Sequence, residues 1–240
     1  MSSFFGRYQY GPDQVEELES TTRAFKTTHT WVALSAILYG LEQRGVIDSF
    51  NENIPCKQGK EQPLLTLPFI DWFESHDFTN WNLIEIGSGN STFYFSKYFK
   101  QVTSYETNKE WYLKTKDRLP DNVKYNLIDL NTHFPDYSNV SDTTMILIDC
   151  ASSRLKVATN VMEKSRPGVV VLDNSDSYTN TSTLLTKYGY REIPFWGLKL
   201  SQHHESCTSI FIKDIKNLPN REYEFRSVNS RKIINNLWDT

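Results

Sequence analysis

Cysteine is scarce in this sequence, and no apolar run is long. The three cysteines, Cys56, Cys150 and Cys207, lie far apart and form neither a disulfide framework nor a zinc-ligand spacing, so a reducing cytoplasm is the expected location. The longest apolar run, from Trp31 to Leu41, is too short to span a bilayer, which takes about 20 such residues. The amino-terminal segment lacks a basic start followed by an apolar block, so a secretory signal is not expected.

An excess of basic residues is also lacking. The formal net charge is −3, and the lysines and arginines are scattered, whereas a protein that binds nucleic acid through its phosphates usually has a clear basic excess. Nucleic acid is therefore not the expected partner. With 38% hydrophobic and 23% charged residues among 240, the chain is long enough for one soluble domain with a sizeable core and some additional helical material.

The first part of the chain has helical patterns followed by a polar segment. Residues 13–44 are expected to be helical, in one or two pieces, with Asp13 as a cap and Gly45 at the end. Residues 51–63 are polar and contain proline and glycine, which is typical of a linker or surface loop. A short helix with an apolar face is expected within residues 64–76.

Strand and helix patterns alternate from Trp81 onward. This alternation predicts an α/β fold with a mostly parallel sheet that helices cover on both faces. Two last strands have no helical pattern between them, so they should form a terminal antiparallel hairpin. The expected strands are residues 82–86, 101–105, 123–128, 144–148, 168–172, 190–196 and 207–214, and the expected helices are residues 91–99, 108–118, 153–165 and 177–187.

The turn after the first strand of this sheet is a candidate ligand site. In "LIEIGSGNST" two glycines surround a serine between an apolar run and a helix, and ligands of open α/β sheets bind beyond the carboxyl ends of the strands. Glycines let the backbone approach a ligand, and free amide groups at a helix start favour polar or anionic groups. A nicotinamide-dinucleotide fingerprint needs glycine or alanine at a third position, which here is Thr92, so that fingerprint is broken.

The next two strands end in acids. Glu106 can accept hydrogen bonds from both ribose hydroxyls of an adenosine, and such charge-assisted bonds are worth roughly 1.5–3 kcal/mol each. Alternatively, Glu106 only caps the helix that starts near Asn108. Asp129, or a nearby backbone amide, is placed to meet the adenine edge, although a simple turn role for Asp129 is also open.

From Leu64 to Asp214 the ordered motifs resemble class I S-adenosylmethionine-dependent methyltransferases, in particular a bacterial branch with an E-x-G-S-G-x-S-T loop. The motifs that carry the resemblance are this loop (Glu85 to Thr92), an acid followed by EWY (Glu106, Glu110 to Tyr112), D…R (Asp149, Arg154), PG…LDN (Pro167 to Asn174) and CTSIF (Cys207 to Phe211). The resemblance implies a Rossmann-like sheet with S-adenosylmethionine as cofactor, but it does not give the methyl acceptor. The implied cofactor contacts are Glu85, Gly87, Ser88, Gly89, Ser91, Thr92, Glu106, Asp129 and Asp149.

Two later strand ends are similar to those of catechol and caffeoyl-coenzyme A O-methyltransferases. In those enzymes an Asp and an Asp-Asn pair hold a divalent cation, which implies Asp149, Asp173 and Asn174 as ligands of Mg²⁺. Alternatively, no metal binds, Asp149 polarises the cofactor site, and Asp173 or Asn174 caps the next helix. The lysine base that those enzymes place shortly after the first Asp is missing, because residues 150–153 are Cys-Ala-Ser-Ser.

A base could come instead from the loop between the last two strands. This loop should project over the active site, and it contains His203 and His204. A histidine near its unperturbed pKa of about 6.5 can take a proton from a hydroxyl or an amine. We do not expect zinc binding by these histidines with Cys207, because adjacent side chains point apart in an extended chain.

The leading hypothesis is a cytoplasmic methyltransferase that methylates a hydroxyl, or less readily an amine, of a small molecule or sugar. The expected domains are a helical extension (1–63), the S-adenosylmethionine-binding domain (64–214) and a tail packed on it (215–240). Residues 1–60 and the loop 196–206 should build the acceptor pocket. Two other classes stay open: a non-catalytic adenosyl-binding scaffold protein of the same fold, and an NAD-dependent oxidoreductase.

Overall fold

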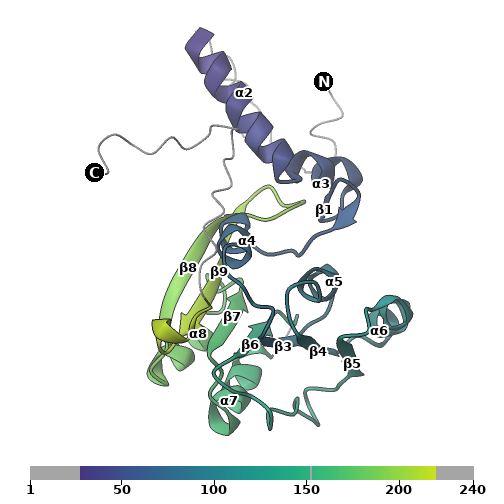
Figure 1. Ribbon diagram of the computed structural model, residues 1–240, viewed down its shortest axis with the longest axis vertical. Coiled ribbons are helices and arrows are strands. Elements are labelled where there is room, and N and C mark those ends of the chain that lie inside the picture. The colour runs from purple at the N-terminus through teal and green to yellow at the C-terminus, as the bar shows by residue number, and fades with distance from the viewer. Residues whose placement is uncertain (1–27, 152, 220–240) are drawn as a thin grey trace. The chain divides into compact units, whose positions relative to one another are not determined.

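Seven strands form one sheet in the order β5-β4-β3-β6-β7-β9-β8 (Figure 1). The computed structural model describes residues 28–151 and 153–219. Strands β5, β4, β3, β6 and β7 are parallel, and β9 is antiparallel to both of its neighbours, β7 and β8. The predicted α/β sheet with a terminal antiparallel hairpin is therefore confirmed. The strands are β3 (Asn82–Ile86), β4 (Gln101–Glu106), β5 (Val123–Leu127), β6 (Thr144–Ile148), β7 (Val169–Asp173), β8 (Arg191–Leu198) and β9 (Glu205–Ile212).

Helices cover both faces of this sheet, because successive strand residues point to opposite sides. Leu83, Met145 and Val169 pack with the aromatic residues of α4 and α5 in one buried cluster. Ile84, Ile146 and Val170 pack with α7 and α8 in the other. The helices of this part are α4 (Leu67–Glu74), α5 (Asn90–Phe95), α6 (Lys109–Thr115), α7 (Arg154–Lys164) and α8 (Thr179–Lys187), with short 3₁₀ turns η1 (Lys116–Arg118) and η2 (Ile215–Asn217).

The segment before the sheet is more ordered than a loop. Helix α2 (Thr28–Gln43) ends two residues before Gly45, which has a φ of +81° and precedes α3 (Val46–Glu52). A hairpin of two-residue strands, β1 (Cys56–Lys57) and β2 (Lys60–Glu61), then occupies part of the predicted loop 51–63. Its turn residues, Gln58 and Gly59, both have positive φ, which matches the twist of a tight hairpin.

The turn between β8 and β9 lies at the edge of the sheet where the parallel strands end. Since β9 is antiparallel to β7 and β8, β8 runs in the same direction as β7. The residues after Leu198 therefore emerge beside the carboxyl ends of β6 and β7, as expected. Helix α3 meets this turn, because the backbone N–H of Ser201 donates to the hydroxyl of Ser49 at 3.0 Å.

The chain divides into two compact units, and the larger one contains Arg44–Arg226. Helix α2 belongs to the smaller unit. The boundaries predicted at residues 63/64 and 214/215 stay predictions, and the predicted cap Asp13 lies outside the described residues. Among the helices of residues 28–151 and 153–219, none is long and apolar enough to cross a membrane.

Candidate functional site

The two glycines after β3 have different surroundings. Gly87 has a φ of +97°, and a Cβ atom there would lie only 2.6 Å from the carbonyl carbon and oxygen of Asp149. Gly87 is therefore needed so that the end of β3 can lie against the end of β6. Gly89 has an extended backbone with φ at 172°, and a Cβ atom there would meet nothing within 4 Å. The space beside the loop is thus open at Gly89, not at Gly87.

The backbone amides of this loop already have acceptors in the chain. Gly87 donates to the carbonyl of Tyr105 at 2.9 Å, Ser88 donates to a carboxylate oxygen of Glu106 at 3.2 Å, and Gly89 donates to the hydroxyl of Thr92 at 3.2 Å. The sequence had predicted free amide groups here. A ligand that used these amides would have to displace their present acceptors.

Glu85 lies beneath the loop with no exposed surface. Its carboxyl group accepts hydrogen bonds from the hydroxyls of Ser91, Thr92 and Ser104 at 2.5–2.6 Å. Burial raises the pKa of Glu85, and these three hydrogen bonds oppose that rise. The group ties the start of α5 to β4, and it explains why a hydroxyl residue stands at position 92. Glu85, Ser91 and Thr92 are predicted cofactor contacts, and all three are buried.

Glu106 joins the loop to the end of β4. One carboxylate oxygen accepts the backbone N–H groups of Thr107 and Asn108 at 2.7 Å each. The other oxygen accepts from both the backbone and the hydroxyl of Ser88, and that hydroxyl lies 2.7 Å from the hydroxyl of Tyr125. The cap of α6 is the Asn108 side chain, which accepts from the N–H of Trp111 at 3.0 Å. Helix capping therefore does not explain why the second carboxylate oxygen of Glu106 is hydrogen-bonded to Ser88.

Asp129 lies in the exposed turn after β5. It accepts hydrogen bonds from the backbone and side-chain amides of Asn131 at 2.9 and 3.1 Å, and the backbone bond is the main cause that lowers the pKa of Asp129. This is a local turn stabilised by an Asp side chain. The turn role left open by the sequence is therefore present, and the contact with adenine stays a prediction.

Arg154, at the start of α7, connects the ends of β6 and β7. Its guanidinium donates to the carbonyl of Cys150 at 2.8 Å, to the carboxylate of Asp149 at 3.0 Å, and to the backbone carbonyl of Asp173. It also lies 4.2 Å from the centroid of the Tyr178 ring. The Arg154 side chain is thus almost fully enclosed, at 6% exposure, whereas the Asp149 side chain is 24% exposed.

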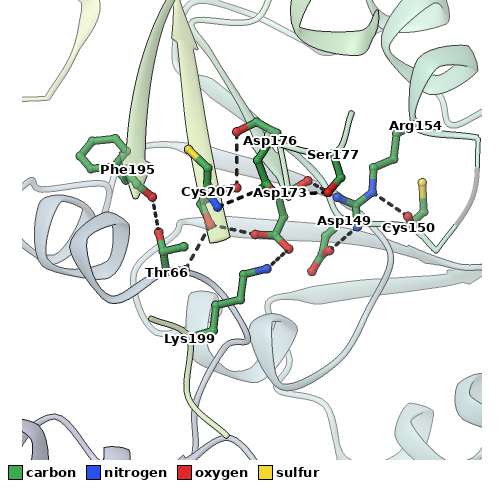
Figure 2. A network of polar contacts seen from close by, with 12 residues as sticks. Thr66, Asp149, Cys150, Arg154, Asp173, Asp176, Ser177, Phe195, Lys199 and Cys207 are labelled. Atoms are coloured by element: carbon green, nitrogen blue, oxygen red, sulfur yellow. Dashed lines mark hydrogen bonds and ion pairs between the residues drawn. The ribbon is translucent and has the colours of Figure 1, made fainter. Parts of the chain in front are cut away.

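A second ion pair lies beside the first. The ammonium of Lys199 donates to Asp173 at 2.6 Å, and the Lys199 and Asp173 side chains are only 1% and 3% exposed (Figure 2). The other oxygen of Asp173 accepts from the hydroxyl of Thr208 at 2.8 Å, which in turn accepts from the backbone N–H of Thr66 at 3.1 Å. Residues from before the sheet, from β7, from β9 and from the turn after β8 therefore meet at one point.

These contacts do not fit the Mg²⁺ site that the sequence predicts. Both carboxylate ligands are paired with buried cations, Asp149 with Arg154 and Asp173 with Lys199. A divalent cation between them would have to displace these pairs or lie beside two positive charges, which is unfavourable in a buried site. Asn174, the third predicted ligand, has a φ of +52°, and its carbonyl accepts the N–H groups of Ser177 and Tyr178 in the turn that precedes α8.

The histidines occupy the turn between β8 and β9, as expected. His203 and His204 are exposed, and their ring centroids lie 5.3 Å apart. Sequence reasoning missed Lys199, four residues earlier in the same turn. A lysine in a hairpin turn is normally solvated, and only its distant partner Asp173 gives it a buried position.

No protein-family model matches the chain, and no curated protein sequence matches it. Several solved structures are similar to it at low identity. Precorrin-6y C5,15-methyltransferase from Geobacter metallireducens GS-15 has a TM-score of 0.48 at 14% identity, with 69% of this chain and 96% of that chain covered. The N-methyltransferase NodS from Bradyrhizobium japonicum WM9 has a TM-score of 0.44 at 13% identity, covering 55% and 85%. The tRNA (m1A58) methyltransferase TrmI from Aquifex aeolicus has a TM-score of 0.45 at 11% identity, covering 71% and 75%.

Proposed function

We propose that this protein transfers a methyl group from S-adenosylmethionine to a hydroxyl of a small molecule or sugar. The observation that carries the proposal is the environment of Glu106. This buried carboxylate lies at the end of β4, next to the glycine loop, and its hydrogen-bond donors among the described residues are all amide and hydroxyl groups. A ribose hydroxyl could replace the Ser88 hydroxyl without any change of charge, and the open space at Gly89 lies in the same loop.

The strand order supports the same proposal. The sheet is parallel with an antiparallel hairpin at its end. This is the sheet that the resemblance of the sequence motifs to class I methyltransferases implies. In such a sheet the loop after β3 and the ends of β4 and β6 face one crevice. Glu106 would hold the ribose, Asp129 or a nearby amide the adenine, and Asp149 would lie near the reactive methyl group.

Bound S-adenosylmethionine would supply an electrophilic methyl group on a sulfonium centre. The chain's own task is then to align the acceptor atom with that methyl group, because the reaction is an in-line displacement. Asp149 is the partly exposed carboxylate at this end, so it can orient the acceptor and receive its proton. His203 or His204 is the other source of a base, and loss of roughly 100-fold in turnover in His203→Ala or His204→Ala would select that route.

Binding and transfer assays separate this proposal from the two other classes. Calorimetry should detect binding of S-adenosylhomocysteine and no binding of nicotinamide dinucleotides. The reverse result would favour an oxidoreductase. Transfer of a labelled methyl group should be detected with hydroxyl acceptors and should persist in the presence of a chelator. Binding of S-adenosylhomocysteine without transfer to any acceptor would favour the scaffold protein.

A further inference from the structure

Lys199 is a buried cation whose hydrogen-bonding capacity is only partly used. A lysine ammonium has three N–H donors, and within residues 28–151 and 153–219 the single acceptor in reach is Asp173 at 2.6 Å. A buried ammonium is costly unless it is paired and hydrogen-bonded. The pairing with Asp173 offsets part of this cost, and two donors are left for another group.

Asp149 can accept a further hydrogen bond, whereas Lys199 can donate one. One of its oxygens accepts from Arg154, and the other has no hydrogen-bond donor among the described residues. Lys199 and Asp149 are linked through Asp173 and Arg154: Lys199 donates to the Asp173 carboxylate, and Arg154 donates to both the Asp149 carboxylate and the Asp173 backbone carbonyl. Figure 2 shows the ends of the Lys199, Asp149 and Asp173 side chains in one region. An incoming group that both accepts and donates a hydrogen bond would satisfy Lys199 and Asp149 together.

We propose that Lys199 binds the acceptor oxygen of the methyl transfer, in the role that the sequence resemblance had given to Mg²⁺. The inference rests on the proposed function. The ammonium, held by Asp173, would donate to the acceptor hydroxyl from one side. The second oxygen of Asp149, which does not accept from Arg154, would accept the proton of that hydroxyl from the other, more exposed side.

The chemical step balances with these groups. A lone pair of the acceptor oxygen forms the new O–C bond, the C–S bond of the methyl donor breaks, and its electron pair stays on sulfur. The acceptor proton passes to Asp149, and Lys199 keeps its own protons while it stabilises the negative charge that develops on oxygen.

This geometry selects oxygen over nitrogen. A hydroxyl oxygen has two lone pairs, so one can accept from Lys199 while the other attacks the methyl group. A neutral amine has a single lone pair, and a hydrogen bond from Lys199 would block it. We therefore infer that the acceptor is an alcohol or phenol and not an amine.

The test uses the full chain, a labelled methyl donor, and three probes: phenol, 4-nitrophenol and aniline. The wild type should methylate phenol and 4-nitrophenol but not aniline. The rate of methyl transfer to phenol should be about 100-fold lower in Lys199→Met than in the wild type. The rate with 4-nitrophenol should fall much less, because this phenol already ionises near neutral pH and depends less on the Lys199 charge to stabilise its oxygen. Thr208→Val removes the other hydrogen bond to Asp173 and is the matched control, so it should lower both rates by the same factor.

Three results would overturn the inference. One is methylation of aniline by the wild type as fast as of phenol, which requires no variant to fold. Another is an equal loss with both phenols in a folded Lys199→Met variant. The third is no transfer to either phenol by a wild type that binds S-adenosylhomocysteine. Failure to bind S-adenosylhomocysteine would instead contradict the proposed function itself, so the two failures are distinguishable.

Discussion

The carboxylates at the two ends of the candidate site are stabilised by different partners. At the β3 and β4 end, Glu85 and Glu106 accept hydrogen bonds from hydroxyl and backbone amide groups. At the β6 and β7 end, Asp149 and Asp173 are paired with Arg154 and Lys199. Under the proposed function, the first end exchanges one neutral donor, the Ser88 hydroxyl, for another, a ribose hydroxyl. The second end is already neutralised by cations, so it does not require a metal for charge balance.

The largest expected effect comes from breaking the buried ion pair at the second end. Asp173→Ala leaves the Lys199 ammonium buried without its partner, which typically costs 3–5 kcal/mol. We expect the free energy of unfolding in urea to fall by about that much. The double variant Asp173→Ala/Lys199→Met should be clearly more stable than Asp173→Ala, because no charge is left unpaired. A double variant that is less stable than Asp173→Ala would contradict this account of the pair.

The next effect separates the two glycines at the first end. Gly87→Val places a β-branched side chain at positive φ and against the backbone of Asp149, so we expect a loss of roughly 3 kcal/mol or more in the free energy of unfolding. Gly89→Val is the matched variant. It should keep the stability, because its side chain enters open space, but weaken binding of S-adenosylhomocysteine. Equal losses in the free energy of unfolding of the two variants would contradict the presence of open space beside Gly89.

A smaller effect concerns pH and Glu85. An unfolded glutamate titrates near 4.3, and burial raises the pKa of Glu85 in the folded chain. The folded state therefore holds a proton over the interval between these values. Protonation of Glu85 therefore stabilises the folded state. This contribution to the free energy of unfolding is complete below about pH 4 and is lost as the pH rises through the folded-state pKa of Glu85. Urea denaturation at several pH values across this interval should show that the free energy of unfolding falls less steeply with rising pH for Glu85→Gln than for the wild type. Parallel profiles would argue against a raised pKa.

Much of the sheet could be predicted because its signals are local. The runs at β3 and β6 have the predicted bounds, and those at β4 and β5 differ by one residue at one end. Strand β7 begins and ends one residue later than predicted. Helix α5 is shorter than predicted. It ends at Phe95, where hydrogen bonds from residue 97 to 94 and from 98 to 95 form turns that lead to β4. The hairpin in residues 56–61 was missed, because two-residue strands have no periodicity and Gln58 is an unusual residue at positive φ.

The site was harder to predict because its determinants lie far apart in the chain. Gly87 was predicted to meet the ligand. The steric reason for a glycine at this position is the approach of the Asp149 backbone, which follows from the register of β3 and β6. The predicted metal ligands Asp149 and Asp173 were correctly placed at neighbouring strand ends. Their partner Lys199 depends on the hairpin that folds back beside β7, so no local pattern indicates it.

The most direct test of the proposed function is calorimetric titration of S-adenosylhomocysteine into the wild type and Glu106→Ala. Loss of the carboxylate removes the proposed acceptor for the ribose hydroxyls, so the affinity should fall about 10-fold or more. Circular dichroism should show that the variant is folded, because Glu106 also accepts two backbone N–H groups. A wild type that binds and a folded Glu106→Ala variant that binds at least 10-fold more weakly are the predicted result. Unchanged affinity in the folded variant, or no binding by the wild type, would contradict it.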